Sequence, residues 1–401
     1  MSKFVKLSSI AELTVGFVGT MAKHYEDEGI PFLRSLNIKP FKIISDDMKY
    51  VSAEFSNNLS KSILHKGDVV IVRTGIPGTC CVVPAEYDGC NCSDVVIVHP
   101  NTELVNPHYL AAYINFWGQR QIQNNKVGAI QQHFNVHSAE EMLIFLPDIT
   151  EQEKIAKTIV ALNGKIENNF SVCVELEAMA KTLYDYWFTQ FDFPDENGKP
   201  YCSSGGEMVW NDQLKREIPK GWQVSSIGSV TRNYDSKRVP LSQNERDTMK
   251  GGIPYYGATG IMDYVNRHIF DGQYVLIAED GSVMDAKGNP IVQMIWGKTW
   301  VNNHAHVLQG CNGYSNELLY LLLQHIPVVK IMTGSIQKKI NQDNLNSYKI
   351  PQIPDPISQA FYESVKPMFE KIQFLQAEND ELTKLRDWLL PVLMNGQATV
   401  E

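Results

Sequence analysis

Residues 155–187 read IAKTIVALNGKIENNFSVCVELEAMAKTLYDYW, and apolar side chains recur in this stretch at alternating intervals of four and three residues. This spacing, sustained over more than four heptads, is typical of a long helix whose apolar stripe packs against a second helix. The preceding Thr150–Glu153 fits a capping box at the helix start. The stripe consists of Ile155, Ile159, Leu162, Ile166, Asn169, Cys173, Leu176, Ala180, Leu183 and Trp187.

The same ten positions, shifted by 206 residues, form a second stripe of mostly apolar residues from Phe361 to Leu393. One stripe alone would favour packing within its own domain, but two equivalent stripes favour packing on each other. We expect Pro367 to kink or delay the second helix and Pro391 to end it. The sequence predicts an antiparallel coiled coil with these packing residues: Ile155, Ile159, Leu162, Ile166, Leu176, Leu183, Val365, Met368, Ile372, Leu375, Leu382 and Leu389.

The repeat extends upstream of the helices, where the matching pieces keep the same order but their spacing drifts. Leu7–Ile10 matches Val224–Ile227, and Gly29–Phe32 matches Gly252–Tyr255. Because internal repeats determine the architecture, we expect a variable domain followed by a constrained helix, twice over.

The segments before each helix are rich in short apolar runs broken by Gly, Pro and Asn, such as 69–72 and 274–278. Such runs predict strands, with one helix in each segment, over 107–121 and 315–324. The fold class is α+β, with two small mixed domains joined by two long helices. We place the first domain at 1–148, a central helix and linker at 149–211, the second domain at 212–353 and the C-terminal helix at 354–401.

The 401 residues carry a formal net charge of −9, which alone argues against a nucleic-acid partner. The charge is uneven, however: −2 over 1–146, −6 over 147–211, +3 over 212–350 and −4 over 351–401. The acidity is concentrated in the helical segments, so the globular segments remain compatible with a polyanion. With no long apolar run, no signal peptide and seven cysteines, we expect a cytoplasmic chain with reduced thiols and no membrane partner.

Motifs for phosphate loops, dinucleotide binding, zinc proteases and serine hydrolases are absent from the sequence. Cys80, Cys81, Cys90 and Cys92 offer four thiols within thirteen residues, but adjacent strand residues point to opposite faces. We therefore favour buried thiols over a metal site, and a structural role for His304 and His306. We predict no catalytic residue, metal or cofactor in this chain.

Candidate nucleic-acid contacts are scattered basic and amide side chains. For each of them, a solvated side chain on the surface is the simpler interpretation. Gln pairs well with adenine, and Lys or Arg with phosphate or guanine. The repeated Gly-[Ala/Ser]-Ile-Gln element supplies several of them. The candidates are Arg34, Lys39, Arg73, Gln131, Gln132, Lys298, Gln337, Lys338 and Lys339.

Over essentially its whole length the chain resembles the specificity (S) subunits of type I restriction-modification enzymes. The resemblance rests on five motifs besides the paired helices after Pro147 and Pro354. These motifs are Gly29–Ile38, Gly67–Gly75, Ile218–Trp222, Gly252–Gly260 and Ala278–Gly281.

The resemblance implies a non-catalytic DNA reader in which each domain binds one half of a split double-stranded target. The helices set the spacer and dock two modification subunits, which hold S-adenosylmethionine and methylate adenine. Restriction subunits add ATP-driven translocation and cleavage. Two alternatives remain: an enzyme of another type, disfavoured by the missing motifs, and a coiled-coil scaffold joining two protein-binding domains without DNA specificity.

Overall fold

The computed structural model describes residues 3–118, 134–285, 287–334 and 338–397. It divides into two compact units: unit 1 comprises Met1–Asn169 with Glu378–Glu401, and unit 2 comprises Phe170–Ala377. Two long helices, α5 (Ile149–Tyr184) and α10 (Asp355–Met394), each contribute one part to each unit. None of the helices in the described ranges is long and apolar enough to cross a membrane.

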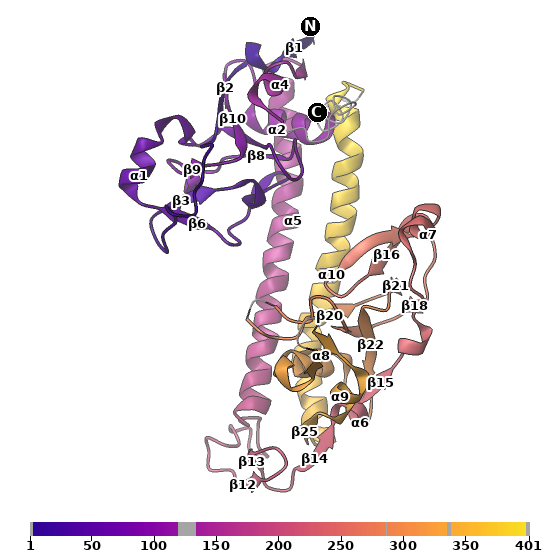
Figure 1. Cartoon of the computed structure of the whole chain (residues 1–401). Coiled ribbons are helices and arrows are strands. Elements are labelled where there is room, and N and C mark those ends of the chain that lie inside the picture. The colour runs from indigo at the N-terminus through magenta and orange to yellow at the C-terminus, as the bar shows by residue number, and fades with distance from the viewer. Residues whose placement is uncertain (1–2, 119–133, 286, 335–337, 398–401) are drawn as a thin grey trace. The chain divides into compact units, whose positions relative to one another are not determined.

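Unit 1 is built on a four-stranded antiparallel sheet in the order β2-β10-β7-β8, with a three-stranded sheet β6-β3-β9 beside it. Helix α2 packs on β7 and β8, and β1 pairs with β11 just before α5 begins (Figure 1). The elements before α5 are β1 Lys3–Lys6, β2 Ala11–Val15, β3 Ile30–Leu33, β4 Ile38–Lys39, β5 Lys42–Ile43, β6 Lys49–Val51, α1 Ala53–Asn58, β7 Val69–Val72, β8 Cys80–Val82, β9 Asn91–Cys92, β10 Val95–Pro100, α2 Pro107–Tyr113, α4 Val136–Glu140 and β11 Leu143–Leu146.

Unit 2 repeats this topology with a four-stranded sheet β15-β22-β19-β20 and a second sheet β17-β16-β21-β18. The antiparallel pair β14-β25 stands where β1-β11 stands in unit 1, and β16-β21 is parallel as β3-β9 is. The elements are β12 Met208–Asn211, β13 Arg216–Pro219, β14 Gln223–Ser226, α6 Ile227–Val230, β15 Thr231–Asn233, α7 Gln243–Thr248, β16 Lys250–Tyr256, β17 Ile261–Val265, β18 Phe270–Asp271, β19 Tyr274–Ala278, β20 Val292–Ile295, β21 Lys298–Val301, β22 Ala305–Gly310, α8 Asn316–Gln324, β23 Met332–Thr333, β24 Lys339–Ile340, α9 Gln342–Ser347 and β25 Lys349–Gln352.

The two long helices run antiparallel within each unit, which confirms the predicted coiled coil. In unit 1, Asn169 Nδ2 donates to Asn379 Oδ1 at 2.9 Å, and Asn379 Nδ2 donates to the carbonyl of Ile166 at 3.2 Å. In unit 2, Cys173 lies against the backbone of Ile372. As residue numbers rise along α5, those of their neighbours on α10 fall, and the polar Asn pair fixes the register inside the seam.

The twelve predicted packing residues are all buried or half-buried. Ile155, Ile159, Val365, Ile372 and Leu375 are buried. The half-buried members are Leu162, Ile166, Leu176, Leu183, Met368, Leu382 and Leu389.

Three predictions about the helix ends are wrong: the delay at Pro367, the end at Pro391 and the cap at Thr150. Helix α10 begins at Asp355 and continues past Pro391 to Met394, so neither Pro367 nor Pro391 delays or ends it. Each proline removes one helical hydrogen bond, but Val365, Phe369, Leu390 and Leu393 around them are buried in the cores, and this packing holds the helix together. The cap of α5 is Asp148, whose carboxylate accepts from the Glu151 amide at 3.0 Å, and not Thr150.

Candidate nucleic-acid interface

In the first domain, the three described candidates have different surroundings. Arg34 is mostly covered and forms an ion pair with Asp47 at 2.9 Å, while Lys39 on β4 is exposed. Arg73 Nε donates to the carbonyl of Phe134 at 3.2 Å. Arg34 and Arg73 therefore form contacts within the domain, and Lys39 is the candidate whose charge is most exposed to solvent. Gln131 and Gln132 lie outside the described residues.

In the second domain, Lys298 lies exposed on β21, while Lys338 is half-buried with its ammonium near Met284 Sδ. Lys339 is exposed at the start of β24, and its Nζ lies 2.9 Å from Glu279 Oε1. Gln337 lies outside the described residues. Thus Lys298 presents its charge freely at the surface, whereas Lys339 shares its charge with a carboxylate.

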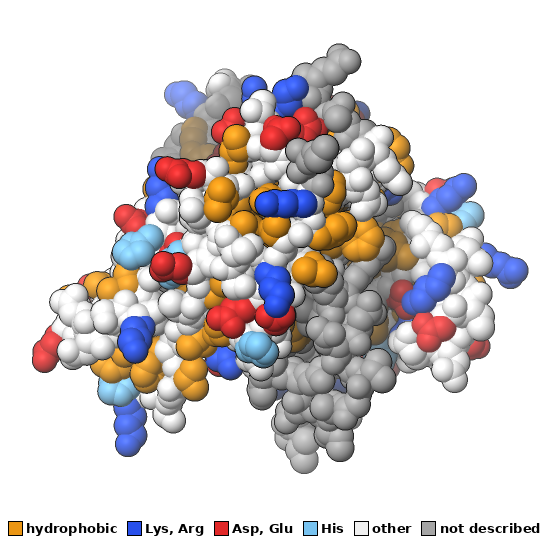
Figure 2. Space-filling view, turned by 90° about the horizontal axis from the view of Figure 1, so that it is seen from above, with side chains coloured by type: hydrophobic (Ala, Val, Ile, Leu, Met, Phe, Trp, Pro, Cys, Tyr) orange, Lys and Arg blue, Asp and Glu red, His pale blue; other side chains and the backbone are white. Residues whose placement is uncertain are grey.

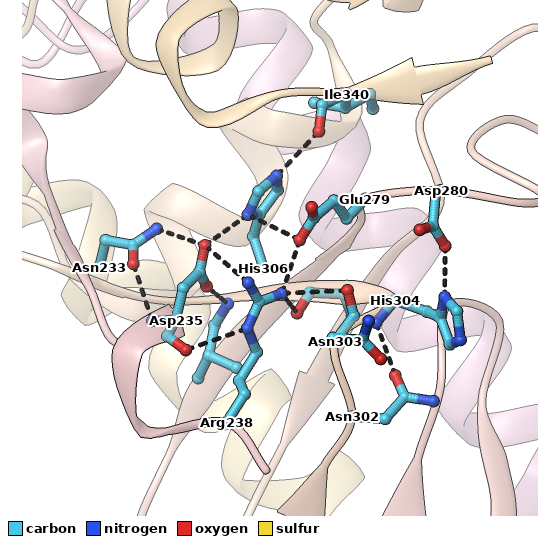
Figure 3. A network of polar contacts seen from close by, with 12 residues as sticks. Asn233, Asp235, Arg238, Glu279, Asp280, Asn302, Asn303, His304, His306 and Ile340 are labelled. Carbon is cyan, nitrogen blue, oxygen red and sulfur yellow. Dashed lines mark hydrogen bonds and ion pairs between the residues drawn. The ribbon is translucent and has the colours of Figure 1, made fainter. Parts of the chain in front are cut away.

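Glu279, the partner of Lys339, belongs to a network of charged side chains (Figure 3). Arg238 Nη1 lies 2.7 Å from Glu279 Oε2 and also donates to the carbonyl of Ala305. His306, on β22, has its Nδ1 2.6 Å from Asp235 Oδ2 and its Nε2 2.9 Å from the carbonyl of Ile340. Because both ring nitrogens of His306 face acceptors, the arrangement favours the imidazolium form. The network ties the end of β19 to β24, which begins two residues after the Gly-Ser-Ile-Gln element in the sequence.

The network shifts the titration of its members. Burial opposes a charge on His306, but the hydrogen bond and charge of Asp235 outweigh it and raise the pKa of His306. Burial likewise opposes ionisation of Asp235 and Glu279, yet their cationic partners lower the pKa of both carboxyl groups.

These shifts predict a pH dependence of local stability. The contribution of His306 is complete below the pKa of an unfolded histidine, about 6.5, and is lost as pH rises through its raised pKa. The contributions of Asp235 and Glu279 are present above about pH 4 and are lost as pH falls through their lowered pKa values. We expect the hydrogen-exchange protection of the β22 amides to decline at alkaline pH in the native chain. In the His306→Gln variant this alkaline decline should be absent. An identical alkaline decline in both proteins would contradict the assignment.

Asp235, Glu279 and His306 are the one group among the described residues whose ligand atoms lie close enough together to hold a metal ion. They do not suit one. Arg238 and Lys339 already neutralise the carboxylates, and His306 is oriented as a donor by Asp235 and Ile340. The cluster is consistent with a structural ion network.

The four clustered cysteines are all buried, and three of them divide between separate cores. Cys80 packs in the core beneath α2, where its thiol lies 3.3 Å from the carbonyl of Ala111. Cys81 and Cys92 belong to the core on the other face of the sheet. Burial raises the pKa of the Cys90 thiol to about 11, so it remains protonated near neutrality. The described surroundings are those of buried thiols.

The face of the molecule shown in Figure 2 carries charges of both signs. On the face shown in Figure 2, the described Lys and Arg side chains stand singly among Asp, Glu and apolar groups. Such a surface provides little long-range attraction for a polyanion. Binding of nucleic acid would then depend on local contacts and on charge from elsewhere.

A family model described as "Type I restriction modification DNA specificity domain" matches the chain twice, over residues 2–177 and 219–384. The chain belongs to this specificity family. The two matches fall on the two halves of the repeat, and each runs from a globular domain into a long helix.

Related members of the specificity family are the type I restriction enzyme MjaIX specificity subunit of Methanocaldococcus jannaschii and a putative specificity subunit, S.HindORF215P, of Haemophilus influenzae. The first is 29% identical over 280 residues, covering 65% of this chain and 62% of the relative. The second is 37% identical over 152 residues, covering 37% of each. The matched regions span less than two thirds of either relative.

The crystal structure of the S subunit from M. genitalium has the same fold as this specificity-family chain. It aligns with a TM-score of 0.55 over 98% of this chain and 96% of that one, at 16% identity. The likeness covers both domains and both helices.

Reasoning from the sequence missed Asp235, Arg238 and Glu279. Glu279 lies in the motif Ala278–Gly281, which carried part of the family resemblance, and His306 was expected to be structural. Asp235 and His306, for example, lie 71 positions apart, so no local spacing indicated that they meet.

Proposed function

We propose that this chain is the non-catalytic, DNA-reading subunit of a type I restriction-modification complex. Each domain reads one half of a split double-stranded target, and the helices dock two modification subunits. The duplicated domain-and-helix unit, matched twice by the specificity model, carries this proposal. We retain the boundaries 1–148, 149–211, 212–353 and 354–401 for the functional regions, and place the complex in the cytoplasm.

Apolar side chains on the outer faces of the helices support docking of protein partners. On α10, Phe374, Leu385 and Trp388 are 59%, 44% and 63% exposed, and on α5 Val174 is 50% exposed. The apolar stripes of these helices are already covered where the helices pack on each other. Further large apolar side chains that remain exposed are typical of an interface with another protein. The modification subunits would carry S-adenosylmethionine, and restriction subunits would carry ATP.

The net charge of −9 suggests that the isolated chain binds DNA weakly and that partner subunits supply part of the phosphate neutralisation. A coiled-coil scaffold without DNA specificity is the alternative. It predicts no sequence-dependent methylation when the partners are present.

The deciding experiment is to express the chain with its modification subunit in a host that lacks both, and to sequence the methylated adenines. We expect one split motif, and loss of one half-site when residues 212–353 are exchanged for those of another family member. No methylation motif, or an unchanged motif after the exchange, would contradict the proposal. Expression of the modification subunit alone is the control.

Lys338 and Lys339 provide a test of phosphate contact. We expect replacement of both by Gln in the assembled complex to weaken binding to all sequences similarly and to reduce the slope of log affinity against log salt by roughly one to two. Lys339 must break its ion pair with Glu279 in order to contact a phosphate. We therefore expect it to contribute the smaller part of the change in slope. Changing Gln337 should instead alter base preference in one half-site.

The measurement is affinity against salt on a target and a scrambled duplex. Lys384→Gln, on the exposed surface of α10, is the matched control. An unchanged slope in the double variant would show that DNA binds elsewhere.

A further inference from the structure

A cavity of about 320 Å³ lies within unit 2, where the end of α5 meets β13 and β25. Its volume falls at the lower end of the range for small-ligand sites. Aromatic rings of Tyr184, Phe188, Trp222 and Tyr348 form much of its wall. The cavity therefore offers apolar, flat surfaces to an occupant.

The charged groups lining this cavity are all of one sign. Arg216, Lys330 and Lys349 line it, and no Asp or Glu does. The remaining titratable nitrogen, on His325, already lies 2.9 Å from Asp185. No described carboxylate forms an ion pair with the three cations, so their charges are uncompensated within the described chain.

Arg216 is held in place by contacts that leave its charge available. One nitrogen donates to the carbonyl of Thr189 at 2.8 Å, and the guanidinium stacks 4.5 Å from the ring of Phe191. Burial lowers the pKa of Arg216, although the nearby phenols of Tyr184 and Tyr348 act in the opposite direction. A half-buried guanidinium oriented by a carbonyl and a ring is a preorganised donor for an oxyanion.

The two phenols add further donors. Burial raises the pKa of both Tyr184 and Tyr348, so each keeps its proton. The cavity thus brings together several donors and aromatic walls, without a carboxylate to occupy the donors.

The other half of the repeat lacks this chemistry. By the same shift of 206, Leu143 stands in place of Lys349, and Leu390 and Met394 stand in place of Tyr184 and Phe188. Leu390 and Met394 are buried in the core of unit 1. These three positions are therefore aliphatic in one copy, and cationic or aromatic in the other.

We propose that this cavity binds an oxyanion, a carboxylate or phosphate, that carries an aromatic or apolar group. The oxyanion lies on Arg216 and Lys349, and the attached group lies against Phe188 and Trp222. A free carboxylate of a polypeptide and a nucleotide phosphate share this chemistry. Phosphates of duplex DNA do not fit, because a stacked duplex cannot place a base or ring inside the cavity.

Isothermal titration of the full chain tests the proposal with two matched pairs of probes. N-acetyl-phenylalanine is compared with its neutral amide, and adenosine 5′-monophosphate with adenosine. We expect saturable binding of the anionic member of at least one pair and little of its neutral analogue. The pair that responds distinguishes a carboxylate from a phosphate source. Inorganic phosphate alone should bind more weakly than the responding probe.

Variants assign the binding to this cavity. We expect Arg216→Gln to weaken binding by about tenfold or more. Lys349→Gln, at an exposed position, and Tyr348→Phe, which removes only a hydroxyl, should weaken it without unfolding the chain. Lys220→Gln, outside the cavity and paired with Glu207, should leave binding unchanged. No saturable binding at millimolar probe, equal binding of neutral analogues, or full affinity in Lys349→Gln and Tyr348→Phe would overturn the proposal.

Discussion

Insertion of one heptad into each long helix is expected to lengthen the spacer between the two methylated half-sites by about three base pairs. Seven residues add about 10 Å of helix at 1.5 Å per residue, and duplex DNA rises about 3.4 Å per base pair. A heptad preserves the apolar seam. The insertions belong between Phe170 and Cys173 in α5 and between Ile372 and Glu378 in α10, since these segments are flanked by the same cross-helix contacts.

The antiparallel pairing makes the matched insertion necessary. A heptad in α5 alone would shift Ile166 and Asn169 away from Asn379 and leave buried amides without partners. We expect that single insertion to reduce assembly instead of giving a new spacing, so it serves as the control. The motif is obtained by sequencing methylated adenines from cells that express each variant with the modification subunit. An unchanged spacing with the double insertion would show that the helices do not set it.

The Phe361→Ala substitution should cost about 3–5 kcal/mol of unfolding free energy in unit 2, the range for a fully buried phenylalanine. Phe361 has no exposed surface, and its ring lies 4.9 Å from that of Phe188 and 5.5 Å from that of Trp187. It joins α10 to the end of α5, so its loss opens a cavity between the helices.

Phe374→Ala is the matched control, because Phe374 lies on the same helix and is 59% exposed. We expect it to change stability by less than about 0.5 kcal/mol. Hydrogen exchange of the α8 amides separates unit 2 from unit 1, which a single denaturation curve of a two-unit chain does not. Equal losses of hydrogen-exchange protection in the two variants would mean that Phe361 does not stabilise the packing of α10 against the end of α5.

Much of the architecture was predictable because the 4-3 spacing is a local signal. Ile159 and Ile372 belong to the seam, as expected from their neighbours in sequence alone. The continuity of α10 across Pro367 and Pro391 was not predictable in this way. It depends on Phe361, Val365 and Leu393 packing against distant residues, and that energy does not appear in the local propensity of proline.

The candidate DNA contacts were less predictable than the helices. Arg34 and Lys339 looked like free surface charges, but Asp47 and Glu279 pair with them. The partner of Lys339 lies sixty positions earlier and meets it only because β24 is held beside the end of β19. An ion pair between residues far apart in the sequence can be predicted only when the fold is known. A heptad pattern can be recognised in the sequence alone.

The discontinuity of unit 1 has a consequence for biosynthesis. Its core contains Leu7 and Ile10 near one end of the chain and Leu390, Leu393 and Met394 near the other. A ribosome that has made the first domain and α5 still lacks these last aliphatic side chains, whereas unit 2 is one uninterrupted segment, Phe170–Ala377. The nascent chain must therefore keep part of an apolar helix uncovered during most of its translation. Of the two units, the one that begins earlier in the sequence is therefore completed later.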